Sequence, residues 1–333
     1  MEDIQRIKVS IGLIAYKHAK YIRQALDSIL NQKVNFIYEV VIGDDCSNDG
    51  TREILLEFQE KYPDKIFPII NTTNVGASRN SMQVRERLKG EYIIGGECDD
   101  FWIGFDKLQQ QVDFLDSHPE FVAVGTNHVN TDVNGKNWKV ALFPWQVNRS
   151  YSLIDFFQYG YTLHNNTILH RNVIPINSDK YKKLKLAAPT MGDVIQLCLL
   201  LDKSPIFILS DITHAHRSGI DTPTSFSYTS KLKALDYTRM YARIVEALNE
   251  YFEYKYDFSQ LLANRIAGAL IIPRLLGRSK IDKAQERDYI NSLSEKTRYR
   301  IYQRVFQKLV RLTIHRIFRP FLNNYYDIKK YNN

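Results

Sequence analysis

The chain has 333 residues, of which 44% are hydrophobic and 25% are charged, and its formal net charge is +8. This length and apolar content suffice for one large core with an appended subdomain, while 10 Pro and 15 Gly scattered along the chain exclude a long disordered linker. The polar N-terminus has no secretory signal, no apolar run reaches membrane-spanning length, and three cysteines lack paired metal spacing. We therefore expect a cytoplasmic protein in a reducing compartment.

Strand and helix patterns alternate over the first hundred residues. The apolar run Val9–Ala15 predicts a buried strand, and apolar residues at helical spacing over Tyr21–Leu30 predict the helix that follows it. A second strand, Tyr38–Asp45, and a third, Tyr92–Gly96, are each followed by a helical pattern. Three such units in a row predict an α/β protein with a parallel, doubly wound sheet.

Carboxylates follow two of these strands at the points where the strands end. Because the carboxyl ends of parallel strands meet at one edge of a sheet, where α/β proteins bind ligands, we expect the carboxylates to lie together. Asp99 and Asp100 repel each other and are costly to desolvate, so a divalent cation would stabilise them. The alternative is an acidic turn that caps the next helix. The similar ending of the earlier strand, Asp44-Asp45, favours the metal site.

Three ordered motifs resemble family 2 glycosyltransferases of the GT-A fold. They are the opening segment from Val9 to Gln32, the loop Asp44-Asp45-Cys46-Ser47-Asn48-Asp49-Gly50-Thr51, and the run Glu97-Cys98-Asp99-Asp100-Phe101-Trp102, which is similar to the metal-binding DxD signature. The resemblance covers residues 8 to 128 well and weakens towards 220. It implies a Rossmann-like, mostly parallel sheet flanked by helices. The implied catalytic domain spans 1–222, with a nucleotide-sugar half at about 1–102 and an acceptor half at about 103–222, before a helical C-terminal region at 223–333.

The resemblance also implies a reaction. One sugar would move, with inversion, from a nucleotide diphosphate sugar, by default a UDP-sugar, to a glycan or lipid-linked acceptor in cell-surface polysaccharide biosynthesis. Mn²⁺ or Mg²⁺ would neutralise the charge that develops on the diphosphate. Asp45 would accept a hydrogen bond from the base. The implied donor-binding residues are Ala15, Tyr16, Asp44, Asp45, Asp99 and His216, and the implied metal ligands are Asp99 and Asp100.

An inverting transferase needs a general base for the acceptor hydroxyl. The apolar helix predicted at Gly192–Leu201 has Asp193 in its first turn and resembles the family segment that supplies the base. The alternative is an Asp that only stabilises the helix N-terminus. His214 and His216 alternate along a predicted strand and so share a face. The resemblance places His216 near the metal or diphosphate, with a plain surface strand as the alternative, and Arg217 is a candidate phosphate ligand.

The basic excess lies near the C-terminus. Residues 273–333 contain fifteen Lys or Arg against five Asp or Glu, a net +10, so the rest of the chain carries −2. From Tyr302 to Phe321 apolar residues recur at helical spacing with Arg304, Lys308 and Arg311 on the other side, which predicts a basic amphipathic helix ending near Pro320.

Three partners fit this amphipathic helix. It can lie on an anionic membrane surface at the inner face of the cell membrane. Its apolar stripe can instead pack on the catalytic domain, or on a second subunit in a homodimer. Nucleic acid is disfavoured, because the catalytic part is not basic.

Two rival functions share parts of this pattern. A nucleotidyltransferase acting on sugar phosphates would also use a metal and a nucleotide, but it needs a glycine-rich basic loop after the first strand, which Ala15–Lys20 does not contain. A nicotinamide dehydrogenase is excluded for a similar reason. A non-catalytic glycan-binding or membrane adaptor would share the fold, and the intact carboxylates argue against it.

Overall fold

The structure is a computed structural model that describes residues 6–160, 163–187, 191–219, 234–277 and 282–325. The chain divides into two compact units. Met1–Leu153 and Tyr161–Ser218 form the body of the first unit, and Ile154–Gly160 and Gly219–Asp327 form the second. The second unit thus takes in a short segment that we expected within the catalytic part. The boundary predicted at residue 222 stays a prediction.

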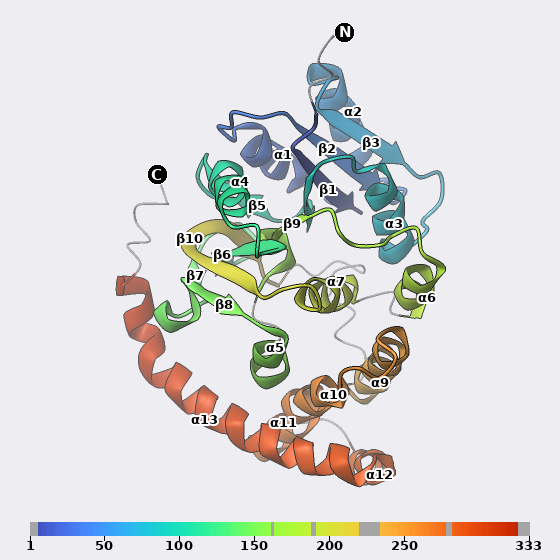
Figure 1. Cartoon of the computed structure of the whole chain (residues 1–333), viewed down its shortest axis with the longest axis vertical. Helices are drawn as coiled ribbons and strands as arrows, with labels where there is room; N and C mark the ends of the chain where they lie inside the picture. Colours follow the sequence, from blue (N-terminus) through green and yellow to red (C-terminus); the bar gives the residue numbers. More distant parts are fainter. Residues whose placement is uncertain (1–5, 161–162, 188–190, 220–233, 278–281, 326–333) are drawn as a thin grey trace. The chain divides into compact units, whose positions relative to one another are not determined.

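A ten-stranded sheet forms the centre of the first unit (Figure 1). Its strands are β1 (Val9–Ala15), β2 (Tyr38–Asp44), β3 (Ile66–Ile70), β4 (Tyr92–Glu97), β5 (Phe101–Trp102), β6 (Ala123–Thr131), β7 (Lys139–Val140), β8 (Arg149–Tyr151), β9 (Leu169–Arg171) and β10 (Ile206–Arg217). The order is β3-β2-β1-β4-β9-β6-β10-β5, with β7 beside β6 and β8 beside β10. Strands β1 to β4 are parallel, as predicted, whereas β9 runs antiparallel to both β4 and β6.

The helices of the first unit follow the strands in sequence. They are α1 (Ile22–Leu30), α2 (Thr51–Lys61), α3 (Ala77–Arg87), α4 (Lys107–Ser117), α6 (Asp179–Ala187) and α7 (Gly192–Leu201), with short 3₁₀ turns at Pro144–Gln146 and at η2 (Asn165–Thr167). The sequence predicted α1 and α7 with these bounds or within a residue of them, because their apolar residues are dense and their ends are marked.

Side chains of β1 alternate between two helical layers. Val9, Ile11 and Leu13 are buried in the core that α1, α2 and α4 cover. On the other face, a Cβ at Gly12 would lie 3.0 Å from Leu88 Cδ1 and 3.1 Å from Val84 Cγ1, so α3 packs closely there. Helices therefore cover both faces of the sheet, as the doubly wound pattern predicted.

The strand order reverses between β1 and β4, which sets the place of a ligand site. Strands β1, β2 and β3 succeed each other in one direction, and β4 joins β1 on its other side. In the register, Ala15 pairs with Asp44 and Ile14 pairs with Glu97, so the three strands end at the same level. Open α/β sheets bind ligands at such a reversal, outside the carboxyl ends of the strands.

The second unit is helical. Its helices are α5 (Leu153–Tyr159), α9 (Ala234–Tyr251), α10 (Ser259–Ile266), the π-helical turn η3 (Ala267–Ile271), α11 (Ile272–Leu275), α12 (Lys283–Ser292) and α13 (Glu295–Tyr325), as Figure 1 shows. Ile244, Leu248, Phe258, Ile266 and Leu270 are fully buried and form its core.

Helix α13 differs from its prediction in two ways. It continues past Pro320 to Tyr325, so the predicted end was wrong; a proline lacks one N–H but can be carried inside a long helix. Arg304 is 8% exposed and donates to the Gln158 carbonyl (2.9 Å) and to Gln260 Oε1 (2.8 Å). The basic face thus packs inward in this part of the helix, while Tyr302 and Phe306 are exposed. The side chains of Arg311 and of residues 314–325 lie outside the described residues.

Across the described parts of the chain, every helix is too short or too polar to cross a lipid bilayer.

Candidate functional site

Asp100 is a buried anchor at the carboxyl edge of the sheet. Its carboxylate accepts hydrogen bonds from the Arg217 N–H (2.8 Å) and Asn166 Nδ2 (3.1 Å), and it contacts His214 Nε2 at 3.1 Å and His216 Nδ1 at 3.3 Å. Burial raises the pKa of Asp100, but the hydrogen bonds and charges of the two histidines outweigh burial and hold this pKa well below its usual range. Asp100 therefore stays ionised and ties β10 and η2 to the end of β4.

His214 and His216 lie on one face of β10, as their alternation predicted, since both contact Asp100. Burial lowers the pKa of His214 to about 4 and that of His164 well below its usual range. Neutral imidazoles are the form that binds metal ions. Asp100, His164 and His214 hold donor atoms within 4.8 Å of one another, which fits a divalent cation.

Asp99 has different surroundings from its neighbour. Its side chain is half-buried and, in the part of the chain that the structure describes, no other residue donates a hydrogen bond to its carboxylate. Burial raises the pKa of Asp99, the charges of His18 and His216 oppose this, and the Asp100 charge adds to it, so that the net pKa is raised. Among the described residues, Asp99 thus lacks the hydrogen-bond donors that hold the carboxylate of Asp100.

Glu97 adds a third carboxylate to this edge. Desolvation, then the charges of Asp99, Asp100 and Asp193, raise the pKa of Glu97 to about 8. The charge of Asp193 acts on Glu97, so the first turn of α7 lies in the electrostatic neighbourhood of the end of β4. Four carboxylates that repel one another in a partly buried site favour a bound cation.

Arg217 holds the acidic segment in place. Its guanidinium donates to the Asp99 carbonyl and to Gln24, and it lies 5.0 Å from the centre of the Tyr21 ring and 4.7 Å from that of Phe101. Each terminal nitrogen thus makes one of these bonds, and Arg217 positions the backbone of Asp99. The phosphate contact suggested for Arg217 stays a prediction.

The loops after β1 and β2 are tied together beside the acidic segment. The Asp45 N–H donates to the Ala15 carbonyl (3.0 Å), and the Lys17 N–H donates to Ser47 Oγ (2.9 Å). Lys17 and Cys46 have left-handed backbone angles, with φ of 58° and 64°. Non-glycine residues adopt this conformation at some cost.

The two carboxylates of this loop are held in place by the protein. Asp45 accepts hydrogen bonds from the Val75 N–H (2.7 Å) and the Gly76 N–H (2.9 Å). Asp44 accepts one from the Ser47 N–H (3.1 Å), and burial raises its pKa. The carboxylate of Asp45 is therefore fixed in orientation at the end of β2, with Tyr16 in the adjoining loop.

Asp193 lies in the first turn of α7 with Lys185 close by. Lys185 is 6% exposed, and its Nζ would lie 2.4 Å from a Cβ added at Gly192. Burial lowers the pKa of Lys185, and the Asp193 charge opposes that effect. The ammonium thus packs on the start of α7, beside the candidate base.

The structure therefore brings the predicted residues from Ala15 to His216 to one edge of one unit. Sequence reasoning missed Glu97, His18 and Lys185 as parts of the site. For Glu97 a signal existed, because it opens the same acidic run. For Lys185 there was none, since it lies in an ordinary basic helix.

Comparisons with known proteins agree with this architecture. Residues 10–177 match the family model of glycosyl transferase family 2. The uncharacterized protein Rv1520 of Mycobacterium tuberculosis is 42% identical over 112 residues, which are 34% of this chain and 32% of that protein. The putative teichuronic acid biosynthesis glycosyltransferase TuaG of Bacillus subtilis is 36% identical over 107 residues, which are 32% of this chain and 41% of that protein. The chain thus spans about a third of the length of the first of these relatives.

A solved structure has the same fold. Staphylococcus aureus TarS 1-349, in complex with UDP-GlcNAc, superposes with a TM-score of 0.61 at 22% identity and covers 86% of this chain and 80% of that one. This likeness confirms the predicted GT-A fold, an α/β sheet domain followed by helices. Because the family model spans half of the chain and the fold agrees with it, the chain belongs to glycosyl transferase family 2.

Proposed function

We propose that the chain is a metal-dependent, inverting glycosyltransferase that moves one sugar from a nucleotide diphosphate sugar to a glycan or lipid-linked acceptor in cell-surface polysaccharide biosynthesis. The observation that carries this proposal is the electrostatic coupling of Glu97 with Asp99 and Asp193 at the reversal of the strand order. The names of relatives support it, since TuaG is named for teichuronic acid biosynthesis and TarS as a poly(ribitol-phosphate) β-N-acetylglucosaminyltransferase. A UDP-sugar is the proposed donor, because TarS was crystallised with UDP-GlcNAc.

We assign the cation to the open side of the acidic segment. Asp100 already accepts hydrogen bonds on both oxygens, so an ion bound there with His164 and His214 would displace them. Asp99 has no such partners, and Glu97 and His216 lie within its electrostatic reach. Asp99 would therefore hold Mn²⁺ or Mg²⁺, with Asp100 anchoring the segment behind it. The bound cation would neutralise the diphosphate leaving group.

The remaining donor contacts come from the loop after β2. The Val75 and Gly76 N–H groups use one acceptor position on each oxygen of Asp45, and each oxygen has a second. Asp45 therefore keeps the role of accepting a hydrogen bond from the nucleotide base, with its orientation already fixed.

Asp193 would act as the general base. Its carboxylate takes the proton of the acceptor hydroxyl while that oxygen bonds to the anomeric carbon from the face opposite the diphosphate, whose bond to the sugar breaks. The nucleoside diphosphate then leaves. The nearby Lys185 ammonium stabilises the ionised form of Asp193, because opposite charges at short range favour the charged state.

We also propose that α13 meets an anionic membrane. Tyr299, Tyr302, Phe306 and Val310 form an exposed stripe on it, 64%, 67%, 70% and 44% exposed. Within the second unit, these four side chains are not covered by the other described helices. Aromatic side chains of this kind favour the interfacial region of a bilayer.

A panel of nucleotide sugars with and without Mn²⁺ tests the central proposal. We expect one nucleotide class to raise the melting temperature only with metal and to be hydrolysed slowly. Asp99→Asn should abolish the metal-dependent shift, whereas Asp193→Asn should keep it and lose transfer. The exposed Asp64→Asn is the matched control and should behave as wild type.

Three results would contradict the proposal. The first is a lack of response to every donor, and the second is an equal loss of donor binding in both site variants. The third is release of pyrophosphate from a nucleoside triphosphate and a sugar phosphate, which would indicate a nucleotidyltransferase instead.

A further inference from the structure

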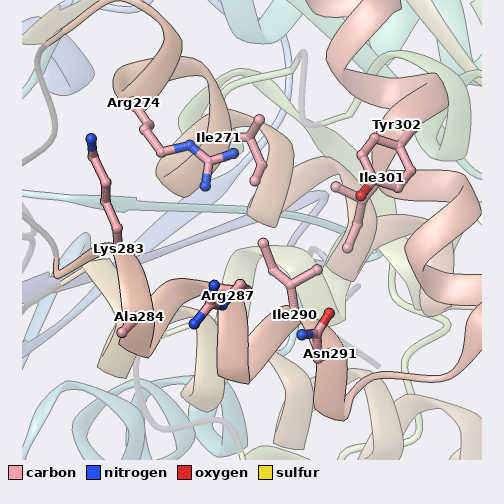
Figure 2. A pocket seen from close by; sticks show the side chains of 9 residues that line it. All are labelled: Ile271, Arg274, Lys283, Ala284, Arg287, Ile290, Asn291, Ile301 and Tyr302. Atoms are coloured by element: carbon pink, nitrogen blue, oxygen red, sulfur yellow. The ribbon is translucent and has the colours of Figure 1, made fainter.

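The second unit contains a cavity of about 470 Å³ between α11, α12 and the start of α13. Arg274, Lys283 and Arg287 line it together with the polar side chains of Asn291 and Tyr302. Figure 2 shows Arg274 on one helical segment and Lys283 and Arg287 on another. The cavity is large enough for a small organic ligand.

One of the three cations is held by a buried carboxylate. Glu286 is fully buried, and its Oε1 lies 3.0 Å from Arg274 Nη1. This ion pair fixes the direction of the Arg274 guanidinium while part of that side chain stays accessible, with 36% exposure. Arg274 is therefore oriented before any ligand arrives.

The other two cations are free to bind. Within the described residues, neither Lys283 nor Arg287 makes an ion pair or a side-chain hydrogen bond, and both are exposed. The charge of Glu286 neutralises that of Arg274, so the side chains of the cavity carry a net charge of two positive charges.

We propose that this cavity binds a phosphate ester whose alcohol part is a small polyol. Two guanidinium groups and one ammonium match a group with up to two negative charges, and the planar guanidinium fits phosphate oxygens in pairs. The volume exceeds that of phosphate alone, and Asn291 and Tyr302 offer hydrogen bonds to hydroxyl groups. The site is independent of the reaction proposed for the first unit.

The phosphate ester has two sources with the same chemistry. It can be a soluble polyol phosphate, or the headgroup of an anionic lipid. The second source is compatible with the position of Tyr302, which lines the cavity and also belongs to the exposed stripe with Phe306 and Val310.

Titration of the full chain with two probes tests the site. One probe is glycerol 3-phosphate, with glycerol as the uncharged comparison, and the other is vesicles of phosphatidylglycerol, with phosphatidylcholine as the comparison. We expect saturable binding of at least one anionic probe, and we expect Arg287→Gln and Lys283→Gln each to weaken it roughly tenfold, since a charge-assisted hydrogen bond is lost. Both residues are exposed, so these variants should fold.

A matched variant distinguishes binding in the cavity from nonspecific attraction by the positive charge of the protein. Arg243→Gln removes one exposed positive charge from α9, outside the cavity, and should leave binding unchanged. Phe306→Ser should weaken vesicle binding and spare glycerol 3-phosphate, which identifies the source. Absence of binding to both probes, or equal weakening by Arg243→Gln and Arg287→Gln, would overturn the proposal.

Discussion

Asp99 and Asp100 are neighbours in sequence but occupy opposite environments. Asp100 accepts several hydrogen bonds on its carboxylate, whereas no other described residue donates one to the carboxylate of Asp99. A carboxylate with several hydrogen bonds stabilises the fold, and one without them is available to a ligand. We therefore expect Asp100 to stabilise the fold and Asp99 to serve the proposed metal site.

Substitution by asparagine should separate these roles. Asp100→Asn should reduce the free energy of unfolding by about 2 to 4 kcal/mol, because buried partners lose a charged acceptor. Asp99→Asn should leave stability unchanged or raise it slightly, since it relieves repulsion, and should remove the stabilisation by Mn²⁺. Urea unfolding with and without Mn²⁺ measures both. A larger loss of stability for Asp99→Asn than for Asp100→Asn would reverse the assignment.

Because two histidines are buried, we predict that the free energy of unfolding falls in mild acid. Burial lowers the pKa of both His128 and His170 to about 3. The unfolded chain binds protons near the ordinary histidine pKa of about 6.5, and the folded chain does not until about 3. The free energy of unfolding is therefore not reduced by these histidines at a pH above about 6.5. As the pH drops from about 6.5 to about 3, it falls by about 1.4 kcal/mol per pH unit for each histidine.

The variant His170→Leu tests this assignment. Unfolding of the variant should take up about one proton fewer than unfolding of the wild type at pH 5. The free energy of unfolding, measured with urea, should therefore depend less steeply on pH between 7 and 5. Parallel pH curves for the variant and the wild type would show that His170 is protonated equally in both states.

At the scale of elements, close contact of α3 with the sheet depends on strand glycines. A Cβ at Gly43 of β2 would lie 2.1 Å from Asn80 Oδ1 and 2.8 Å from Val84 Cγ2. Asn80 is itself buried and donates to the Gly43 carbonyl at 2.8 Å. Helix α3 would have to move away from β2 to accept even a methyl group.

Gly43→Ala should therefore destabilise the first unit by about 2 to 3 kcal/mol, the usual cost of overfilling a packed interface. Gly95→Ala is the matched strand control, because its nearest contacts would be ordinary ones at 3.7 and 3.8 Å. Thermal unfolding of both variants compares them, and an equal effect would mean that α3 adapts without cost.

Elements with strong local signals were predicted well, and those set by distant partners were not. The sequence gives β1, β2, β4 and α7 through dense apolar runs with clear ends. Strand β9 has three residues and exists through antiparallel pairing with β4 and β6, which no local pattern encodes. The inward direction of Arg304 depends on acceptors at Gln158 and Gln260, far away in sequence. In the site, the acidic runs could be recognised in the sequence, but the residues that form hydrogen bonds with Asp100 could not.

At the scale of the whole molecule, each unit has a core of its own, so a ligand in one should protect that unit selectively. We expect donor and Mn²⁺ together to slow amide hydrogen exchange at residues 44–51, 97–100 and 214–217. Exchange in α10 and α13 should stay unchanged. Mass spectrometry of peptic peptides resolves these segments, and slowed exchange confined to α13 would place the donor elsewhere.

The contacts of Asp100 also bear on the order in which the protein is made. Its carboxylate is completed by His214, His216 and the Arg217 N–H, which lie more than a hundred residues later. A ribosome that has released only β1 to β4 has produced the parallel half of the sheet but not its acidic anchor. The donor site that we propose can therefore be completed only in a late step, when β10 emerges from the exit tunnel and pairs with β6.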